Sequence, residues 1–182
     1  MFNVLEISMT NILAISGSLR AKSTNLTIIE NIAEIFSSQI NVTIYDGLAD
    51  LPHFNPDADT DAPPETVIDL RRQIKEADGV LICSPEYVFS VPAALKNALE
   101  WTVSSADFHN KPTAVITASG LGEKAHESLL LILKTIDAKI GENAALLISG
   151  AQTKIKDGKM SDAGTIAQLN LLIESFLHTI ER

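Results

Sequence analysis

Five short runs of apolar residues alternate with segments of helical periodicity along the 182-residue chain. Four of these runs are almost continuously apolar, which predicts strands that helices cover on both faces of a parallel sheet. The runs occupy residues 12–15, 42–45, 80–83, 114–117 and 145–149.

Between and after these runs, apolar residues recur three or four positions apart, which is the spacing of one face of a helix. Pro64 precedes the second of these segments, and Pro92 falls in the first turn of the third, both favourable positions for a helix start. The five stripes are Leu26, Ile29, Ile32 and Phe36; Val67, Leu70 and Ile74; Leu95, Ala98, Leu99 and Thr102; Leu129, Leu130, Ile132, Leu133 and Ile136; and Ile166, Leu169, Leu172, Ile173 and Phe176.

Strict alternation of strands and helices predicts one α/β domain over residues 1–182, with a doubly wound, five-stranded parallel sheet. Five strands favour the flavodoxin-like order 2-1-3-4-5, in which ligands bind beyond the carboxyl ends of the strands. Met9 stands just before the first strand, so we expect residues 1–9 to be a short extension outside this fold.

Residues 47–65, GLADLPHFNPDADTDAPPE, interrupt the alternation with prolines and aspartates, which predicts a loop. Asp57, Asp59 and Asp61 have the alternation of a calcium loop. That motif requires glycine and glutamate where this chain has Ala62 and Ile68. The residues therefore favour a solvated acidic loop over a calcium site.

Charge and cysteine content narrow the range of partners. With 14 basic and 23 acidic residues the formal charge is -9, which disfavours a nucleic-acid partner. No run reaches the roughly 18 apolar residues of a membrane-spanning helix, and the first eight residues lack the features of a secretory signal. Because Cys83 is the lone cysteine, no internal disulfide can form. We expect a cytoplasmic protein with neither nucleic acid nor membrane as partner.

The stretch GSLRAKSTN, residues 17–25, joins the first predicted strand to the first helix. A loop at a helix start points several backbone N–H groups at one place and favours an anion. Ser18, Ser23 and Thr24 add hydroxyl donors, Asn25 adds an amide, and Arg20 adds a guanidinium that can bind phosphate in bidentate fashion.

Two common phosphate motifs do not fit this loop. The P-loop needs a second glycine where Lys22 stands, and the dinucleotide motif needs glycines where Leu19 and Lys22 stand. Binding through side-chain hydroxyls suits one terminal phosphate better than a bridging pyrophosphate. The alternative is that Ser23 or Thr24 simply caps the helix that follows.

Isolated polar and aromatic residues are better explained by structure than by chemistry. Cys83 lies inside a predicted strand and is expected to be a buried apolar residue. The four histidines lack the spacing of a metal site. His126, just after the loop that follows the fourth strand, could border the active site, but a solvated helix residue is expected. Trp101 is assigned to the core or a subunit interface, and Lys96 with Glu100 to a surface ion pair.

A second stretch, SPEYVFSVPAALKNALEW, follows the third predicted strand. Together with GSLRAKSTN it resembles the NAD(P)H-dependent FMN reductases, relatives of bacterial chromate, quinone and azo-dye reductases. The resemblance runs from about residue 11 to residue 176 and includes LPHFNPD after the second strand and ADGVLICSPEY into the third.

The resemblance implies an FMN site with three parts. Its first loop holds the FMN phosphate, its P-E-Y loop frames the isoalloxazine ring, and the loop after the fourth strand supplies backbone contacts, for which glycine suits close approach. In this chain the corresponding residues are Ser18, Arg20, Ser23, Asn25 and the Leu26 backbone; Pro85, Glu86, Tyr87 and Val88; and Ser119, Gly120 and Gly122.

Three positions depart from the family pattern. Val88 stands where the family commonly has asparagine, Phe89 and Ala93 where small residues are frequent, and Leu121 lies in a loop that is usually richer in glycine. A bulkier and more apolar pocket rim follows.

The activity implied by the resemblance is hydride transfer from NADPH or NADH, through FMN, to a quinone, azo compound, chromate or free flavin. No side chain is needed as acid or base, so no catalytic residue is assigned. Two alternatives remain: a flavodoxin-like electron carrier without its own NAD(P)H turnover, and a phosphate-binding or nucleotide-binding protein without flavin.

The resemblance also implies a homodimer or homotetramer built on the helices after strands three and four. Residues 128–136, SLLLILKTI, are apolar on more than one face, which independently indicates burial beyond the chain's own sheet.

Overall fold

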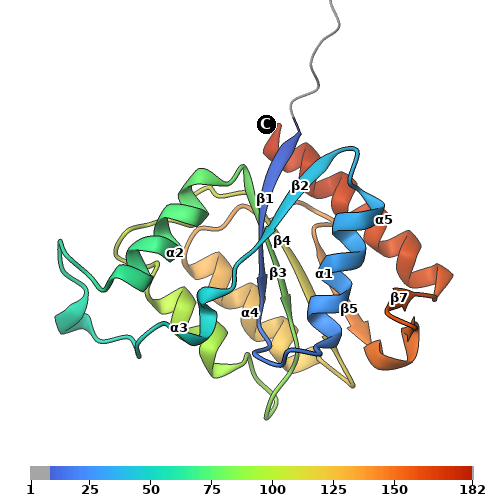
Figure 1. Cartoon of the computed structure of the whole chain (residues 1–182), viewed down its shortest axis with the longest axis horizontal. Helices are drawn as coiled ribbons and strands as arrows, with labels where there is room; N and C mark the ends of the chain where they lie inside the picture. Colours follow the sequence, from blue (N-terminus) through green and yellow to red (C-terminus); the bar gives the residue numbers. More distant parts are fainter. Residues whose placement is uncertain (1–8, 182) are drawn as a thin grey trace, which may run out of the picture.

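Five parallel strands form the central sheet in the computed structural model, which describes residues 9–181 (Figure 1). The sheet order is β2-β1-β3-β4-β5 and every neighbouring pair is parallel, so the flavodoxin-like order predicted above is confirmed. The predicted extension at residues 1–9 lies, except for Met9, outside the described residues. The strands are β1 (Thr10–Ser16), β2 (Ile40–Ile44), β3 (Gly79–Ser84), β4 (Thr113–Ser119) and β5 (Ala145–Ser149).

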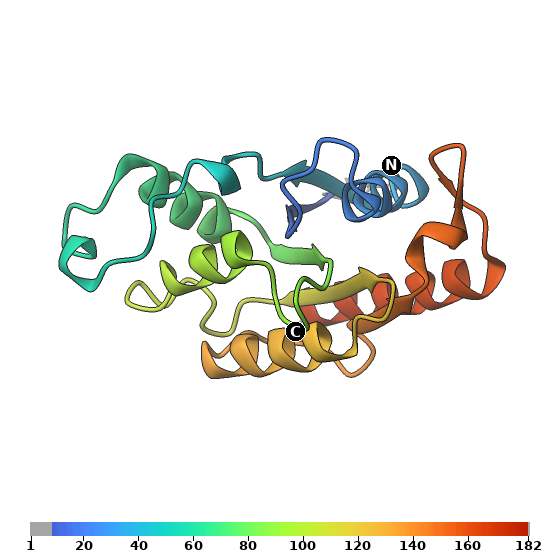
Figure 2. The same ribbon diagram turned by 90° about the horizontal axis from the view of Figure 1, so that it is seen from below.

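Helices cover both faces of this sheet (Figures 1 and 2). One face packs against α1 and α5, the other against α2, α3 and α4. Every residue of the central strand β3 is buried, which explains its continuous apolar run. Within residues 9–181 no helix combines the length and the apolar character needed to cross a bilayer. The helices are α1 (Thr24–Ile35), α2 (Glu65–Glu76), α3 (Ala93–Glu100), α4 (Glu123–Thr135) and α5 (Ala163–Ile180).

A small hairpin after β5, which sequence periodicity did not predict, folds back over α1. It consists of β6 (Ile155–Lys156) and β7 (Lys159–Met160) and follows the 3₁₀ helix η3 (Ala151–Lys154). Asn31, buried in α1, donates to the Gly158 carbonyl (2.9 Å) and accepts from the Met160 N–H (3.0 Å). This amide holds the segment after β5 against α1.

The acidic loop contains the 3₁₀ helices η1 (Gly47–Ala49) and η2 (Pro56–Ala58) and is anchored to α3. Its Pro52 carbonyl accepts from Trp101 Nε1 (2.8 Å) and from Asn97 Nδ2 (2.9 Å). Phe54 meets the Trp101 ring edge to face, with ring centroids 5.1 Å apart. Trp101 itself is fully buried, as expected for a core residue.

Asp59 is an exception within the acidic loop, which was expected to be solvated. Asp57 and Asp61 are exposed, but the Asp59 side chain is only 7% exposed and forms an ion pair with Arg71 Nη2 at 2.7 Å. The hydrogen bond from Arg71 holds the pKa of Asp59 below its usual value. Arg71 Nε also donates to the Trp101 carbonyl (2.8 Å), so one guanidinium joins the loop, α2 and the end of α3.

Replacing Arg71 tests this anchor. We expect Arg71→Ala to lower the free energy of unfolding by about 2 kcal/mol, because it removes charged hydrogen bonds and leaves the largely covered Asp59 carboxylate without its ion-pair partner. Urea denaturation measures the change. Arg72→Ala is the matched control: its partners Asp69 and Glu76 lie on the exposed side of α2, so its midpoint should stay near that of the wild type.

The same pair makes a pH prediction. Because the folded pKa of Asp59 lies below the unfolded value of about 3.9, its stabilisation is fully present above that pH and is lost as the pH falls further. The difference between wild type and Arg71→Ala should therefore shrink below about pH 4. A difference that grew on acidification would contradict the assignment.

Candidate functional site

A pocket of about 420 Å³ lies at the carboxyl ends of the strands, the edge onto which Figure 2 looks. The loops after β1, β3, β4 and β5 all contribute to it, as the doubly wound topology requires. Its size falls within the range of small-molecule sites. It is lined by Ser18, Arg20, Ser23, Thr24, Asn25, Pro85, Glu86, Tyr87, Ala118, Ser119, Gly120, Gly150, Ala151, Gln152 and Thr153.

The loop after β1 begins with a glycine that packing demands. A Cβ on Gly17 would lie 2.4 Å from Ser84 Oγ, so only glycine lets the ends of β1 and β3 approach this closely. Ser23 is the N-cap of α1, and its Oγ accepts from the Asn25 N–H at 3.2 Å. The capping alternative is therefore correct for Ser23, although the residue also lines the pocket. Ser18 Oγ lies 3.3 Å from the Tyr87 hydroxyl, and both residues line the pocket.

Asn25 ties the first turn of α1 to two strands. Its Nδ2 donates to the Ala118 carbonyl (3.2 Å), and its Oδ1 accepts from Cys83 Sγ (3.3 Å). Burial raises the pKa of the Cys83 thiol, which keeps the proton that this bond requires. The expected buried role of Cys83 is confirmed, and Asn25 serves to position the loop.

Glu86 occupies the N-terminus of α4. Its carboxylate accepts from the Gly122 N–H (3.4 Å) and from the Ala125 N–H (3.0 Å), while α4 has no capping side chain of its own. Gly122 itself has φ +94°, and a Cβ there would lie 2.8 Å from Leu147. The loop after β3 is thus joined to the loop after β4 by a charge-assisted cap.

The wall made by the last two loops is continuous, because the Gly150 N–H donates to the Gly120 carbonyl at 3.0 Å. A Cβ added at Gly120 would meet no protein atom within 4 Å, so packing within the chain does not require this glycine. Its backbone stays accessible to a flat ligand, which fits the role that the resemblance implies.

Most of the predicted site residues share this pocket, and three do not line it. Leu26 lies beside an adjoining hollow, Val88 is exposed at the tip of its loop, and Gly122 is buried behind the Glu86 cap. Thr24, which the sequence offered as a hydroxyl donor of the first loop, also lines the pocket. The prediction missed Ala118 and residues 150–153 as lining residues. Residues 150–153 could have been found from the predicted topology, because a loop that follows the fifth parallel strand starts at the same edge of the sheet.

His126 differs from expectation. It is half-buried on α4, and its Nδ1 lies 2.9 Å from Thr117 Oγ1. Burial lowers the pKa of the ring, which favours the neutral form. Within residues 9–181 no cluster of histidine, cysteine and carboxylate side chains is arranged to hold a metal.

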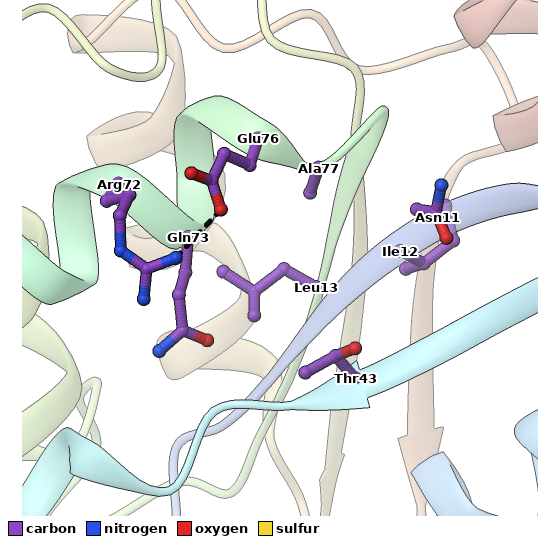
Figure 3. Close-up of a pocket in the computed structure, with 8 residues that line it drawn as sticks. All are labelled: Asn11, Ile12, Leu13, Thr43, Arg72, Gln73, Glu76 and Ala77. Atoms are coloured by element: carbon purple, nitrogen blue, oxygen red, sulfur yellow. Dashed lines mark hydrogen bonds and ion pairs between the residues drawn. The ribbon is translucent and has the colours of Figure 1, made fainter.

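A second hollow, of about 400 Å³, lies between α2 and strands β1 and β2 (Figure 3). Asn11 to Leu13 place it along the amino-terminal half of β1, away from the carboxyl edge. Its guanidinium, on Arg72, is paired with Glu76 at 2.8 Å. Its place on the sheet distinguishes it from the site that the topology favours.

Comparison with known proteins agrees with the pocket. The family model described as NADPH-dependent FMN reductase matches residues 10–153. NADH:(hydroxy)cinnamate reductase subunit CrdA of Vibrio ruber is 32% identical over 174 residues, covering 92% of this chain and 85% of that protein. Quinone reductase of Escherichia coli K12 is 31% identical over 179 residues, covering 94% and 95%.

A solved structure extends the match to three dimensions. The flavoenzyme NAD(P)H:(acceptor) oxidoreductase FerB from Paracoccus denitrificans has a TM-score of 0.77 at 27% identity, covering 95% of this chain and 98% of its own. The chain therefore belongs to the NADPH-dependent FMN reductase family, whose members are oxidoreductases with FMN as cofactor and NAD(P)H as electron donor.

Proposed function

We propose that the pocket at the carboxyl edge holds FMN, and that the protein passes reducing equivalents from NADPH or NADH to a small acceptor such as a quinone, an azo compound, chromate or free flavin. When bound, FMN supplies the hydride and electron chemistry. The observation that carries the proposal is the convergence of four loops on one pocket, whose lining combines the hydrogen-bond donors of the loop after β1 with Pro85, Tyr87 and Gly120.

The hydrogen-bond donors of the loop after β1 suit the phosphate. Arg20 is exposed at the pocket, and the hydroxyls of Ser18, Ser23 and Thr24 lie with it beside the N-terminus of α1. The partial positive charge of that helix end adds to the guanidinium. The net charge of -9 opposes an anion only weakly at this place, because screening limits distant charges to about 8–10 Å.

The residues that the loops after β3 and β4 contribute to the lining suit the ring. Pro85 and Tyr87 from the loop after β3 face the pocket together with Ser119 and Gly120 from the loop after β4. Glu86 is bound to the start of α4 and fixes the distance between these loops. The side chains thus bind and orient, and none is assigned as an acid or a base.

A double variant tests the phosphate position. Ser18→Ala with Arg20→Ala should weaken FMN binding at least about tenfold, because each hydrogen bond to a charged group contributes about 1.5–3 kcal/mol. Quenching of FMN fluorescence during titration measures the dissociation constant. Lys22→Ala, which removes a charge that does not line the pocket, is the control and should have a much smaller effect. Unchanged affinity in the double variant would show that the phosphate does not bind at Ser18 and Arg20.

Anaerobic titration separates this function from the electron-carrier alternative. We expect NADPH or NADH to bleach the bound flavin within the time of one turnover, and an added acceptor to restore the colour. Flavin that binds but is not reduced by either nicotinamide would favour the carrier. Protein that stays colourless after FMN is added and the excess removed would favour a site without flavin.

We also propose that the chain forms a homodimer or homotetramer through α3 and α4. A shallow hollow of about 260 Å³ lies between these helices, and its rim carries Val103 and Leu131, the latter 66% exposed. Large apolar side chains gathered on one face are typical of an interface. Lys96 and Glu100, paired at 2.6 Å as predicted, border the same hollow.

Light scattering tests this surface. The 19.6 kDa chain should scatter as a dimer or tetramer at micromolar concentration, and Leu131→Glu should shift it toward the monomer by placing a charge in the interface. Leu171→Glu, at an exposed leucine on α5, is the matched control. A wild-type protein found only near 20 kDa would rule the assembly out.

A cytoplasmic location without nucleic-acid or membrane partners is part of the same proposal. It is supported by the acidic net charge and by Cys83, the lone cysteine, which is a buried thiol.

A further inference from the structure

We propose that a strained apolar turn at Val88 and Phe89 makes this chain select neutral, apolar acceptors over charged oxyanions. The inference rests on the proposed function, and it assigns to these two residues a role in specificity. It concerns the rim of the pocket, whereas the cofactor-binding proposal concerns its interior.

The turn is a two-residue hairpin. The Tyr87 and Ser90 backbones exchange both hydrogen bonds, each of 3.0 Å, across an antiparallel bridge. Val88 has φ 51° and Phe89 φ 55°, so both central residues lie in the left-handed region. Asparagine and glycine are strongly preferred in such turns, and a β-branched residue there is an outlier. Local propensity therefore opposes the residues that this chain uses.

Burial does not offset this strain. Val88 is 96% exposed and Phe89 is 69% exposed, so neither side chain gains much from packing within the chain. Residues that are unfavourable both in backbone conformation and in exposure are found where function requires them. The large apolar surface at this turn is thus explained by a ligand better than by folding.

The neighbouring loops carry the same feature. Leu19 stands between the pocket residues Ser18 and Arg20, and Leu121 follows Gly120; both leucines are exposed. Each of the loops after β1, β3 and β4 therefore presents an exposed apolar side chain next to the pocket. Such a rim favours an acceptor that itself gains from leaving water.

The charges on the α4 side of this rim disfavour an oxyanion. The N-terminus of α4, a place where an anion could bind, is already occupied by the Glu86 carboxylate. Glu123 adds a second carboxylate to the first turn, and Lys124 is paired with Glu127 at 2.8 Å. A neutral acceptor meets no such repulsion.

A quinone with a fused aromatic ring has the required chemistry. It takes up two electrons and two protons, one hydrogen coming from NAD(P)H as hydride and one proton from water. The products are the hydroquinone and NAD(P)⁺, so the reaction needs no other reductant.

The test compares two substitutions at Phe89. Phe89→Asn fits the left-handed conformation but removes the apolar ring, whereas Phe89→Leu keeps an apolar side chain. The measurement is the ratio of kcat/KM for 2-methyl-1,4-naphthoquinone to kcat/KM for chromate, with FMN content determined for each protein. We expect the ratio to fall about tenfold in Phe89→Asn and to stay near the wild-type value in Phe89→Leu.

Other outcomes would overturn the inference. If the ratio of kcat/KM values is unchanged in Phe89→Asn, or if the wild type prefers chromate, the turn does not select the acceptor. A fall for both acceptors together with dissociation in light scattering would assign the turn to a subunit contact. If the wild type turns over no acceptor, the proposed function fails independently of this inference. Equilibrium dialysis then compares the affinity of the wild type and of Phe89→Asn for the naphthoquinone, which still tests the role of the turn. Leu171→Asn on α5 is the control for loss of an exposed leucine.

Discussion

The hydrogen bonds of one buried amide hold the pocket together. Asn25, 2% exposed, connects the first turn of α1 to the Ala118 carbonyl on β4 and to the Cys83 thiol on β3. A buried amide left without partners costs about 1–3 kcal/mol, so the loop after β1 has one strongly favoured position relative to the two strands. Glu86 and Asn31 act similarly on the loops after β3 and β5. The pocket walls are therefore positioned by polar side chains that the loops exchange.

This arrangement separates positioning from binding. Within residues 9–181 every buried side-chain nitrogen and oxygen has a hydrogen-bond partner, so the interior polar groups are already committed to the fold. The groups left for a ligand are the exposed guanidinium of Arg20, the hydroxyls at the start of α1 and the backbone beside Gly120. A rigid frame with accessible donors can bind a cofactor without first reorganising.

The sequence predicted the strands, the helices and the sheet order better than the side-chain contacts that join the loops. Continuous apolar runs and helical stripes lead to the sheet order because periodicity is a local property, and the carboxyl edge follows from the order. The pairing of Asp59 with Arg71, the cap that Glu86 provides and the Asn31 contact with the hairpin join residues 12, 36 to 39, and about 127 to 129 positions apart. No short-range pattern encodes such contacts. The sequence therefore allowed Asn25 and Glu86 to be assigned to the site, but it did not show which residues they bind.

The turn at Val88 and Phe89 shows where local and global preferences disagree. In most of the chain propensity, burial and hydrogen bonding favour the same structure, as in β3, whose buried run is also a good strand sequence. At this turn the backbone conformation favours asparagine and glycine, and solvent exposure favours polar residues, yet valine and phenylalanine are present. The two hydrogen bonds between Tyr87 and Ser90 close this two-residue turn. Val88 and Phe89 are consecutive large apolar residues with positive φ, and they follow directly after the pocket residue Tyr87. This combination distinguishes them from the scattered apolar residues that any protein surface carries.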